Sequence, residues 1–588
     1  MGGVVEPRGP AVPTHVVATA GHVDHGKSTL VHALTGMQPD RWAEERRRGL
    51  TIDLGFAWTD LAGHRLAFVD VPGHERFVPN MLAGVGPVPA VLFVVAADEG
   101  WMAQSDEHLA ALDAFGVRHG LLAVTKCDRA DPAPARAEAL ARIARTSIGP
   151  VPAVAVSGRT GAGLDELRAE VAALGARLPE PDRGADVRLW VDRAFTVRGA
   201  GTVVTGTLAA GTVAVGDELE LGGNRVRVRG LQTLGAAADR VGAVARVAVN
   251  LRGVERDAVG RGDALHTPGA WRPTGEVDVR LRGTPPADLP TQLVLHLGSA
   301  SVPVRVRPLG TDTARLTLRG TLPLRAGDTG LLRDPGAHRI AAGVDVLDVA
   351  PPPLRRRGAA AARAAELADP AAAFLRHHGA VPAEELRVLG LAPRGALVDG
   401  WHVDEVWWAA VPARAVAAVT AWRAEHPLAD GMPAEALRRR LDVPARLLAA
   451  ALRPTGLSLS DGLVRAPGSR ALPSEVDTAV RAVERRLADH PFHAPAAGDL
   501  AALGLGEREL AAAARLGRLT VLPGGVVLPP DAAERAARIA AALPQPFPLS
   551  ALRQALDTTR RVAVPLAEHL DARGHTERLA DGTRRARI

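Results

Sequence analysis

The residues best suited to chemistry follow an apolar run and lie between Gly21 and Thr29. They read Gly-His-Val-Asp-His-Gly-Lys-Ser-Thr, which contains the Gly-x4-Gly-Lys-Ser spacing of a phosphate-binding loop. In such a loop, backbone N–H groups and the N-terminus of the next helix face phosphate oxygens. Lys27 is then expected to reach the β- and γ-phosphates, and the Ser28 hydroxyl to bind Mg²⁺. The spacing therefore predicts a nucleoside triphosphate and Mg²⁺ as ligands.

Lysine usage supports this interpretation. The chain has only two lysines, Lys27 and Lys126, among 71 lysines and arginines. A compact ammonium fits where a planar guanidinium is too wide. We therefore expect both lysines to lie where arginine cannot replace them.

Further polar clusters follow later apolar runs. Asp70 comes directly after the run 66–69 and is suited to hold the hydration shell of Mg²⁺, while the Gly73 N–H can approach a γ-phosphate. Between the phosphate loop and Asp70, Thr51 is the candidate to sense the γ-phosphate through Mg²⁺. These positions complete a predicted phosphate and metal site.

Two more clusters are suited to a guanine base. Thr125-Lys126-Cys127-Asp128 follows the run 121–124, and Asp128 can accept the two guanine N–H donors and reject adenine. Ser157 and Gly158 follow the run 151–156 and can contact the O6 edge of the base. Because the carboxyl ends of parallel strands meet at one edge of a sheet, we expect all these clusters to lie together.

The elements that must position these residues change along the chain. Apolar runs alternate with helix-like segments over residues 14–180, which predicts an α/β P-loop GTPase domain with a parallel sheet. Short β-rich runs separated by glycine predict two antiparallel β-barrels over residues 185–268 and 272–350. Residues 1–13 are rich in glycine and proline and are expected to be disordered.

After Pro351-Pro352-Pro353, a helical unit of about 55 to 60 residues recurs weakly, each time closed by a short β segment. Helix-turn-helix units with a β hairpin predict a C-terminal array of winged-helix domains. The fold class is therefore multidomain, with the GTPase domain first, two barrels next and the array last. The predicted winged helices span residues 360–410, 411–470, 474–529 and 530–588.

Composition restricts the class of protein further. The net charge is +6 and the isoelectric point about 10.6, a small excess beside 71 cations, so any nucleic-acid surface must be local. The single cysteine, Cys127, excludes an intramolecular disulfide framework and fits a reducing compartment. The strongly apolar run 90–97 is too short to span a bilayer, and residues 1–13 lack the apolar core of a signal peptide. We therefore expect a cytoplasmic protein that does not contact a membrane.

The ordered clusters of residues 14–180 resemble the translational GTPases. The resemblance implies GTP hydrolysis, in which His74 orients the attacking water, Val23 and Leu50 form an apolar gate, and Asp24 helps to place a cation. The side chains of His22 and His25 lack metal-like partners and are interpreted as structural. One departure is Thr125, where the usual guanine motif has asparagine. The residues expected to bind GTP are Asp24, His25, Gly26, Lys27, Ser28, Thr29, Asp70, Gly73, Thr125, Lys126, Asp128, Ser157 and Gly158, and those expected at the metal are Ser28, Thr51 and Asp70.

Residues 191–206 closely resemble the second domain of elongation factor Tu, where the equivalent stretch lines the pocket for the aminoacyl group on tRNA. Here Asp192 is followed by Arg193, and Arg246 falls where that factor has asparagine. Arginine is costly to bury without an anion, and an ionised selenol would supply one. The positions, together with 198–201 and 296–298, resemble the bacterial selenocysteine-specific elongation factors. The alternative is that both arginines pair with local carboxylates such as Asp192 in a structural bridge.

Residues 556–566 resemble the mRNA-binding tail of the same factors. Thr558 is a plausible N-cap, which would point Arg560 and Arg561 outward from a first helical turn. Arginine favours the phosphates and splayed bases of an RNA hairpin through bidentate hydrogen bonds and stacking. The alternative is an array of winged helices that bind protein and carry solvated arginines.

The family resemblance covers nearly the whole chain after residue 13. It implies a monomeric GTPase that carries selenocysteinyl-tRNA to the ribosome and is tethered by its tail to a selenocysteine insertion hairpin in the mRNA beside a UGA codon. One alternative is another translational GTPase, such as a general elongation or initiation factor. A different class of alternative is an RNA adaptor that uses GTP only as a binding switch.

Overall fold

The computed structural model describes most of the chain. The described residues are 14–39, 53–72, 78–85, 88–199, 201–468 and 471–587. The segment 1–13 and the predicted site residues Thr51, Gly73 and His74 lie outside these ranges.

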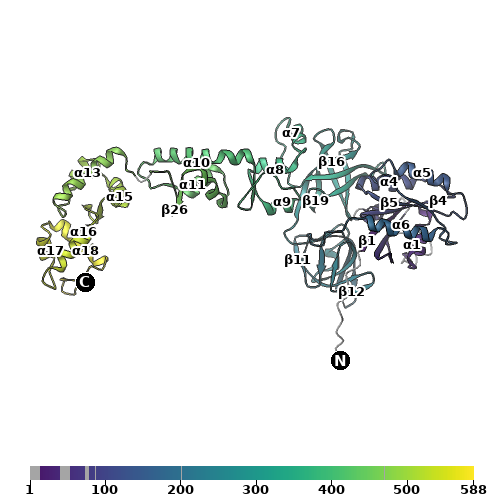
Figure 1. The fold of residues 1–588 in the computed structure, drawn as a ribbon, viewed down its shortest axis with the longest axis horizontal. Coiled ribbons are helices and arrows are strands. Elements are labelled where there is room, and N and C mark those ends of the chain that lie inside the picture. The colour runs from purple at the N-terminus through teal and green to yellow at the C-terminus, as the bar shows by residue number, and fades with distance from the viewer. Residues whose placement is uncertain are drawn as a thin grey trace, which may run out of the picture. The chain divides into compact units, whose positions relative to one another are not determined.

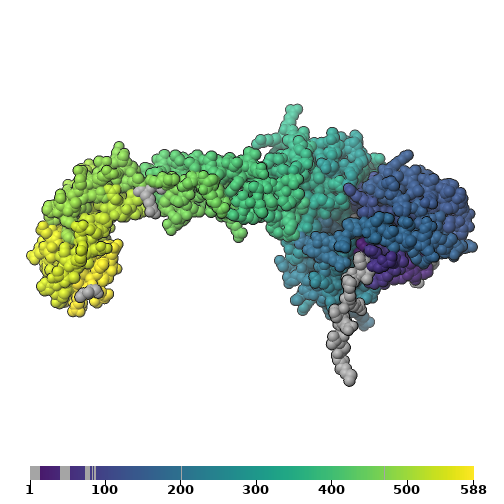
Figure 2. Space-filling model, in the orientation of Figure 1, coloured from purple at the N-terminus to yellow at the C-terminus, as the bar shows by residue number. Residues whose placement is uncertain are grey.

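The chain divides into two compact units. The first comprises Met1–Phe374 with Pro382–Pro393, and the second comprises Leu375–Val381 with Arg394–Ile588. Purple to teal marks most of the first unit in Figures 1 and 2, and green to yellow marks most of the second.

The first unit begins with a six-stranded sheet in the order β2-β3-β1-β4-β5-β6. Strand β1 is parallel to β3 and β4, and only β2 runs antiparallel to its neighbour β3. The strands are β1 (Thr14–Ala20), β2 (Gly55–Leu61), β3 (His64–Asp70), β4 (Ala90–Ala96), β5 (His119–Thr125) and β6 (Ala153–Ala155). The predicted sheet of parallel strands is therefore confirmed, with one antiparallel edge strand.

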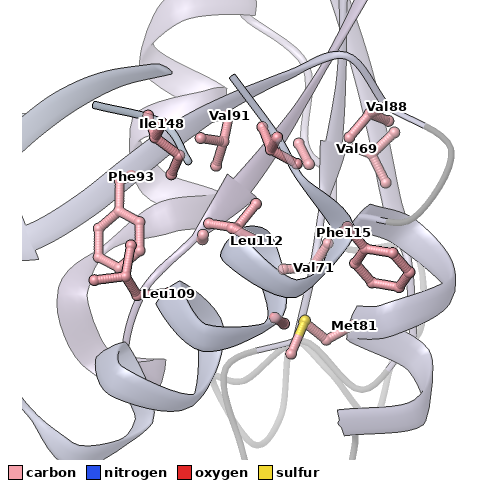
Figure 3. Close-up of a cluster of buried hydrophobic side chains, with 14 of the residues drawn as sticks. Val69, Val71, Met81, Val88, Val91, Phe93, Leu109, Leu112, Phe115 and Ile148 are labelled. Atoms are coloured by element: carbon pink, nitrogen blue, oxygen red, sulfur yellow. The ribbon is translucent and has the colours of Figure 1, made fainter. Parts of the chain in front are cut away.

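Helices cover both faces of this sheet (Figure 1). Alternate residues of one strand serve the two cores, so that Phe93 of β4 packs on one face while Leu92 and Val94 pack on the other. Figure 3 shows Phe93 near Leu109 and Leu112 in the first of these cores. The described helices are η1 (Val23–His25), α1 (Lys27–Thr35), α3 (Val78–Val85), α4 (Ala103–Phe115), α5 (Ala133–Ile143) and α6 (Leu164–Arg177).

A first barrel follows the sheet. Its strand order is β10-β15-β7-β8-β14-β11-β12, and pairing of β10 with β11 closes six of these strands into a ring. The strands are β7 (Arg188–Val197), β8 (Gly201–Leu208), β9 (Thr212–Ala214), β10 (Glu218–Leu221), β11 (Asn224–Thr233), β12 (Ala236–Ala238), β13 (Arg240–Gly242), β14 (Ala245–Arg252) and β15 (Ala264–His266).

The second barrel is closed in the order β16-β19-β18-β17-β20-β21, and its neighbouring strands run antiparallel. The strands are β16 (Arg272–Gly283), β17 (Gln292–Leu297), β18 (Ala300–Pro308), β19 (Thr313–Leu324), β20 (Thr329–Asp334) and β21 (Arg339–Asp348). Both predicted barrels are therefore confirmed, since each closes on itself and leaves no long open edge.

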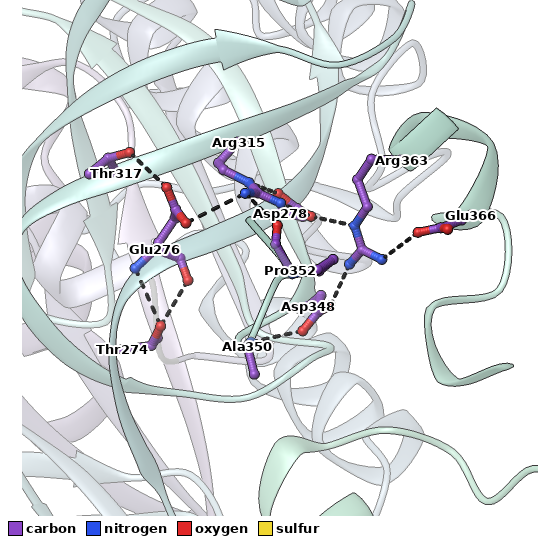
Figure 4. Close-up of polar contacts among 10 residues, drawn as sticks. All are labelled: Thr274, Glu276, Asp278, Arg315, Thr317, Asp348, Ala350, Pro352, Arg363 and Glu366. Carbon is purple, nitrogen blue, oxygen red and sulfur yellow. Dashed lines mark hydrogen bonds and ion pairs between the residues drawn. The ribbon is translucent and has the colours of Figure 1, made fainter. Parts of the chain in front are cut away.

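A buried ionic network joins the second barrel to helix α7 (Ala359–Glu366). The Arg363 guanidinium, 2% exposed, donates to Asp278 at 2.7 Å and also to Asp348. Arg315 donates to Asp278 at 2.7 and 3.0 Å from the other side (Figure 4). The network therefore fixes α7 on the barrel as part of the first unit.

The rest of the chain forms repeated groups of short helices and small β-sheets. Within this region, α16, α17 and α18 lie side by side (Figure 1). The predicted C-terminal array of winged helices is confirmed as a fold class, while its domain limits stay predictions. The helices are α8 (Pro370–His378), α9 (Ala383–Leu389), α10 (Glu405–Glu425), α11 (Ala434–Leu441), α12 (Leu448–Leu452), α13 (Ser474–Asp489), α14 (Ala497–Ala502), α15 (Glu507–Arg515), α16 (Ala532–Ala541), α17 (Leu549–Ala555) and α18 (Arg560–Ala572).

Short strands accompany these helices. They are β22 (Ala380–Pro382), β23 (Ala396–Val398), β24 (Trp401–Val403), β25 (Met432–Pro433), β26 (Ser458–Ser460), β27 (Leu463–Arg465), β28 (Thr520–Leu522), β29 (Val526–Leu528), β30 (Thr576–Arg578) and β31 (Arg584–Ala586). The hydrophobic core around α16, α17 and α18 also contains Leu522 and Leu528 of β28 and β29. Helices α16, α17 and α18 therefore share one hydrophobic core with the hairpin of β28 and β29.

The predicted N-cap of the last long helix is wrong. Helix α18 begins at Arg560 with Thr559 at its N-cap, and the Thr559 side chain makes no capping hydrogen bond. The Thr558 hydroxyl instead donates to the Phe492 carbonyl at 2.5 Å. A tertiary contact has taken the hydroxyl that the local pattern assigned to the helix. In the part of the chain that the structure describes, no helix is long and apolar enough to cross a membrane.

Candidate functional site

The phosphate loop lies between β1 and α1, as predicted. Gly26 has φ 81° and directly precedes α1, a backbone conformation that glycine adopts without strain. The buried Lys27 ammonium donates to the carbonyls of Gly21 and His22 at 2.9 and 2.7 Å. The ammonium is therefore held inside the loop, where phosphate oxygens can replace these carbonyls as its partners.

Two of the three predicted metal residues, Ser28 and Asp70, meet beside this loop. The Ser28 hydroxyl donates to Asp70 Oδ2 at 2.6 Å, and the Thr19 hydroxyl donates to Asp70 Oδ1 at 2.7 Å. Asp70 is fully buried at the end of β3. A carboxylate and a hydroxyl next to a phosphate loop form an oxygen donor set of the kind that Mg²⁺ prefers. Thr19 was missed by sequence reasoning because nothing in its local pattern indicates a partner on β3.

Two neutral histidines support the loop. The fully buried His108 Nδ1 accepts the Gly21 N–H at 3.1 Å, and burial lowers the pKa of His108 to about 3. The His25 ring hydrogen-bonds to the Val94 carbonyl at 3.2 Å, and burial lowers its pKa to about 4. This geometry agrees with the prediction that the His25 side chain has a structural role. His108 was missed, since a lone histidine in a helix carries no motif.

The predicted guanine residues lie at the carboxyl ends of β5 and β6. The Lys126 ammonium donates to Glu99 at 2.5 Å and lies 3.3 Å from Asp98. Asp128 is exposed, and a hydrogen bond with the Ser157 side chain is the main cause that lowers its pKa, so it stays an anion ready to accept N–H donors. A Cβ on Gly158 would stand 3.2 Å from the Thr29 side chain, which places this segment against α1.

The two predicted pocket arginines lie between the first barrel and β2. Arg246 donates to both oxygens of Asp192, one of them at 2.6 Å, and to the Thr205 hydroxyl at 3.0 Å. Its guanidinium carbon lies 4.1 Å from the centre of the Phe56 ring, within the range of a cation–π contact. Arg193 donates to Asp53 at 2.5 Å. Both arginines therefore pair with carboxylates here, which is the arrangement of the alternative interpretation.

Arg193, Arg246 and Phe56 also line a cavity of about 200 Å³. Arg261 lies close enough for its charge to interact with Asp53, Asp192 and Arg193, and it donates to Asn80 at 2.5 Å. Arg193 and Arg246 thus bring two guanidiniums to the lining of one cavity, and the charge of Arg261 acts on the same group of residues. Arg261 was missed because no spacing in the sequence links it to the other two.

The two predicted tail arginines differ in their surroundings. Arg560 is exposed at the first residue of α18. Arg561 is also exposed, but its guanidinium donates to the carbonyls of Ala494 and Pro495 at 2.8 and 3.0 Å. Arg561 therefore joins α18 to the segment before α14, while Arg560 leaves its guanidinium at the surface.

Comparison with known proteins agrees with this geometry. Residues 13–176 match the family model described as the elongation factor Tu GTP binding domain. Elongation factor Tu 2 of Streptomyces avermitilis is 33% identical over 376 residues, which cover 56% of this chain and 95% of that protein. The chain therefore belongs to the elongation factor Tu family of translational GTPases.

Within that family, the chain is similar to selenocysteine-specific elongation factors. Residues 538–585 match the family model described as elongation factor SelB, winged helix. The selenocysteine-specific elongation factors of Desulfomicrobium baculatum and Escherichia coli are each 40% identical, over 65% and 58% of this chain. The chain spans 62% and 56% of the length of these two relatives.

Solved structures show the same likeness. The crystal structure of a bacterial selenocysteine-specific elongation factor superposes with a TM-score of 0.75 at 25% identity, covering 98% of this chain and all of that one. The factor of Methanococcus maripaludis, solved with a GTP analogue, gives a TM-score of 0.51 at 24% identity over 58% of this chain and 80% of that one, which shows a shared fold.

Proposed function

We propose that this chain is a GTP-dependent elongation factor that delivers selenocysteinyl-tRNA to the ribosome at UGA codons. We propose further that its C-terminal winged helices bind a selenocysteine insertion hairpin in the mRNA. The observation that supports the first proposal is the pair of guanidiniums, from Arg193 and Arg246, in the lining of one cavity between β2 and the first barrel. A neutral aminoacyl side chain needs no such charge.

GTP binding and hydrolysis would use the first domain. Backbone N–H groups of residues 24–29 and the Lys27 ammonium would hold the phosphates, and Asp128 would read the guanine N–H donors. Ser28 and Asp70 would hold Mg²⁺, which neutralises charge on the phosphates. His74 and Thr51, which the resemblance implies for water positioning and γ-phosphate sensing, remain proposals on residues outside the described ranges.

The pocket suits an anion even though its arginines already have partners. Asp192 bonds to Arg246 and Asp53 bonds to Arg193, and both guanidiniums still line the cavity, where a further acceptor can reach their N–H groups. A selenol is more acidic than a thiol and is ionised at neutral pH, so a selenolate would gain ion pairs that the hydroxyl of serine would not. Because these contacts are part-buried, their charge is screened less than at an open surface.

The test is the affinity for selenocysteinyl-tRNA and for the same tRNA charged with serine, measured with GTP bound. Arg246→Ala should weaken the selenocysteinyl form by about 1.5–3 kcal/mol, as expected for a charged hydrogen bond, and affect the seryl form far less. Arg225→Ala is a matched control, because Arg225 is an exposed arginine of the same barrel. An equal loss of affinity for both charged tRNAs would show that the arginines are structural. It would favour the alternative of another translational GTPase.

The tail proposal concerns the first turn of α18. Arg560→Ala should weaken binding of the hairpin, since Arg560 presents its guanidinium at the surface. Arg561→Ala should instead loosen the contact with residues 494–495 and lower thermal stability first. Hairpin affinity measured at two salt concentrations would separate the effects, because loss of a phosphate contact reduces the salt dependence. Unchanged hairpin binding in both variants would show that the RNA-binding surface lies elsewhere on the protein.

A further inference from the structure

Thr125 ties the guanine segment to the phosphate loop. Its hydroxyl donates to the His25 carbonyl at 2.7 Å, and the Val95 carbonyl is a second acceptor at 3.4 Å. Thr125 and His25 are both buried, and Thr125 is the last residue of β5. The hydroxyl therefore makes a hydrogen bond across two segments that are 100 residues apart in sequence.

His25 is held from a second side as well. Its ring bonds to the Val94 carbonyl of β4, while its main-chain carbonyl accepts from Thr125 of β5. Strands β4 and β5 are paired neighbours, with Ala96 opposite Thr125. The phosphate loop is thus fixed to two adjacent strands just before Lys27, and Thr125 supplies one of the two attachments.

This bond has a consequence for the base. Guanine presents N–H donors on one edge and two acceptors, O6 and N7, on the other. A threonine hydroxyl has one proton, whereas an asparagine amide has two N–H donors. Because the Thr125 proton is directed to the His25 carbonyl, it is not available to N7.

Two further side-chain donors of the guanine segment also have acceptors within the protein. The Lys126 ammonium is bonded to Glu99 and lies beside Asp98. The Ser157 side chain is hydrogen-bonded to Asp128. Thr125, Lys126 and Ser157 therefore each have an acceptor for a side-chain proton within the protein.

We propose that Thr125 is a positioning residue that anchors the phosphate loop, and that this chain recognises guanine without a hydrogen-bond donor to N7. This inference rests on the proposed binding of guanine nucleotides. The base would then be selected by Asp128 at its N–H edge and by the Ser157-Gly158 segment at O6, with N7 unread.

The first test compares GDP, 7-deaza-GDP and inosine diphosphate on the full chain by calorimetry. The 7-deaza analogue replaces N7 with a C–H group and should bind within about twofold of GDP. Inosine diphosphate lacks the 2-amino donor and should bind at least about tenfold more weakly, as expected for loss of a hydrogen bond to a charged group. A tenfold loss with 7-deaza-GDP would overturn the inference, whereas no binding of GDP itself would defeat the proposed function.

The second test changes the donor. Thr125→Asn should create a preference for GDP over 7-deaza-GDP of about two- to tenfold, the size of one neutral hydrogen bond. Thr125→Val has a similar shape but no hydroxyl, so it should weaken both ligands equally and leave their ratio near one. Thr125→Ser should restore most of what Thr125→Val loses.

Each result decides one part of the inference. Unchanged GDP affinity in Thr125→Val would show that Thr125 does not anchor the phosphate loop. An unchanged ratio of the affinities for GDP and 7-deaza-GDP in Thr125→Asn would show that this position does not face N7. If Thr125→Val does not fold, Thr125→Ala tests the anchoring role in its place, and the wild-type ratio still decides whether N7 is read. A change of the ratio between GDP and 7-deaza-GDP is not expected from a purely structural defect.

Discussion

At the scale of single residues, the geometry around Lys27 makes a sharp prediction. The ammonium lies buried between two carbonyl oxygens 2.9 and 2.7 Å away. A guanidinium is longer and planar, so it cannot take this position without moving the loop. Lys27→Arg should therefore lower affinity for guanine nucleotides at least about 100-fold although the charge is kept. Arg142→Lys on the surface of α5 is the reverse exchange and should leave nucleotide titrations unchanged.

His108 predicts a pH dependence of stability. Its pKa is about 3 in the folded chain against 6.5 for an ordinary histidine, so between these values the unfolded chain binds a proton that the folded chain does not. The contribution of His108 to the free energy of unfolding is therefore complete above pH 6.5 and is lost as the pH falls toward 3. Between pH 7 and pH 5, this one residue should remove about 2 kcal/mol.

The matched variant for this prediction is His108→Gln. Its side-chain oxygen can still accept the Gly21 N–H, but it does not titrate. The thermal transition of the first domain, followed by calorimetry, should shift less between pH 7 and pH 5 in the variant than in the wild type. The same shift in both proteins would show that His108 does not control the acid sensitivity.

The residues that sequence reasoning found and missed differ in a physical way. Lys27 and Ser28 lie in one short segment whose spacing is fixed by the chemistry of phosphate binding. Thr19 and His108 act through partners 51 and 87 residues away, and such pairs form only after the strands have assembled. The role of Thr125 could not be predicted for the same reason, because its partner His25 lies 100 residues earlier.

At the scale of elements, helix α7 depends on one buried arginine. Arg363 is the partner of Asp278 and Asp348, which are 0% and 2% exposed. Removal of a partner from a buried ion pair is strongly destabilising, because it leaves an uncompensated charge. Arg363→Met should lower the stability of the first unit by about 3–5 kcal/mol.

Calorimetry of the full chain would measure this effect. Arg307→Met is a suitable control, because Arg307 is exposed on β18 of the same barrel. Burial raises the pKa of Asp348, so the loss in Arg363→Met should shrink as the pH falls and the carboxyl becomes neutral. The role of Arg363 would be contradicted if Arg307→Met lost this stability and Arg363→Met did not.

Periodicity predicted the elements well and their ends less well. Alternating and continuous apolar runs indicated the strands of the sheet and barrels, because burial on one or both faces dictates that pattern. The start of α18 was placed one residue early, since the Thr558 hydroxyl bonds to Phe492 instead of capping the helix. Local capping rules fail where a tertiary acceptor competes for the same hydroxyl.

At the scale of the whole molecule, α7 belongs with the second barrel, since the first unit continues beyond it to Phe374. The sequence put the end of the second barrel at residue 350, where the three prolines begin. Yet Arg315 also donates to the Pro352 carbonyl at 2.8 Å, and Arg363 donates to the buried Asp278 carboxylate of the barrel. The proline segment is therefore part of the first unit, although its composition is typical of a linker.

A chain ended after Asp369 should therefore fold and bind GTP and selenocysteinyl-tRNA, because every described contact of the network is kept. It should fail to bind the mRNA hairpin and to read UGA as selenocysteine, since α8 to α18 are absent. A chain ended at Ala350 loses Arg363 and should melt at a lower temperature, although its GTP site is the same. Melting, nucleotide titration and UGA readthrough in a reporter would distinguish the two chains. UGA decoding by the chain ended after Asp369 would disprove the tether, and equal melting of both chains would disprove the role of α7.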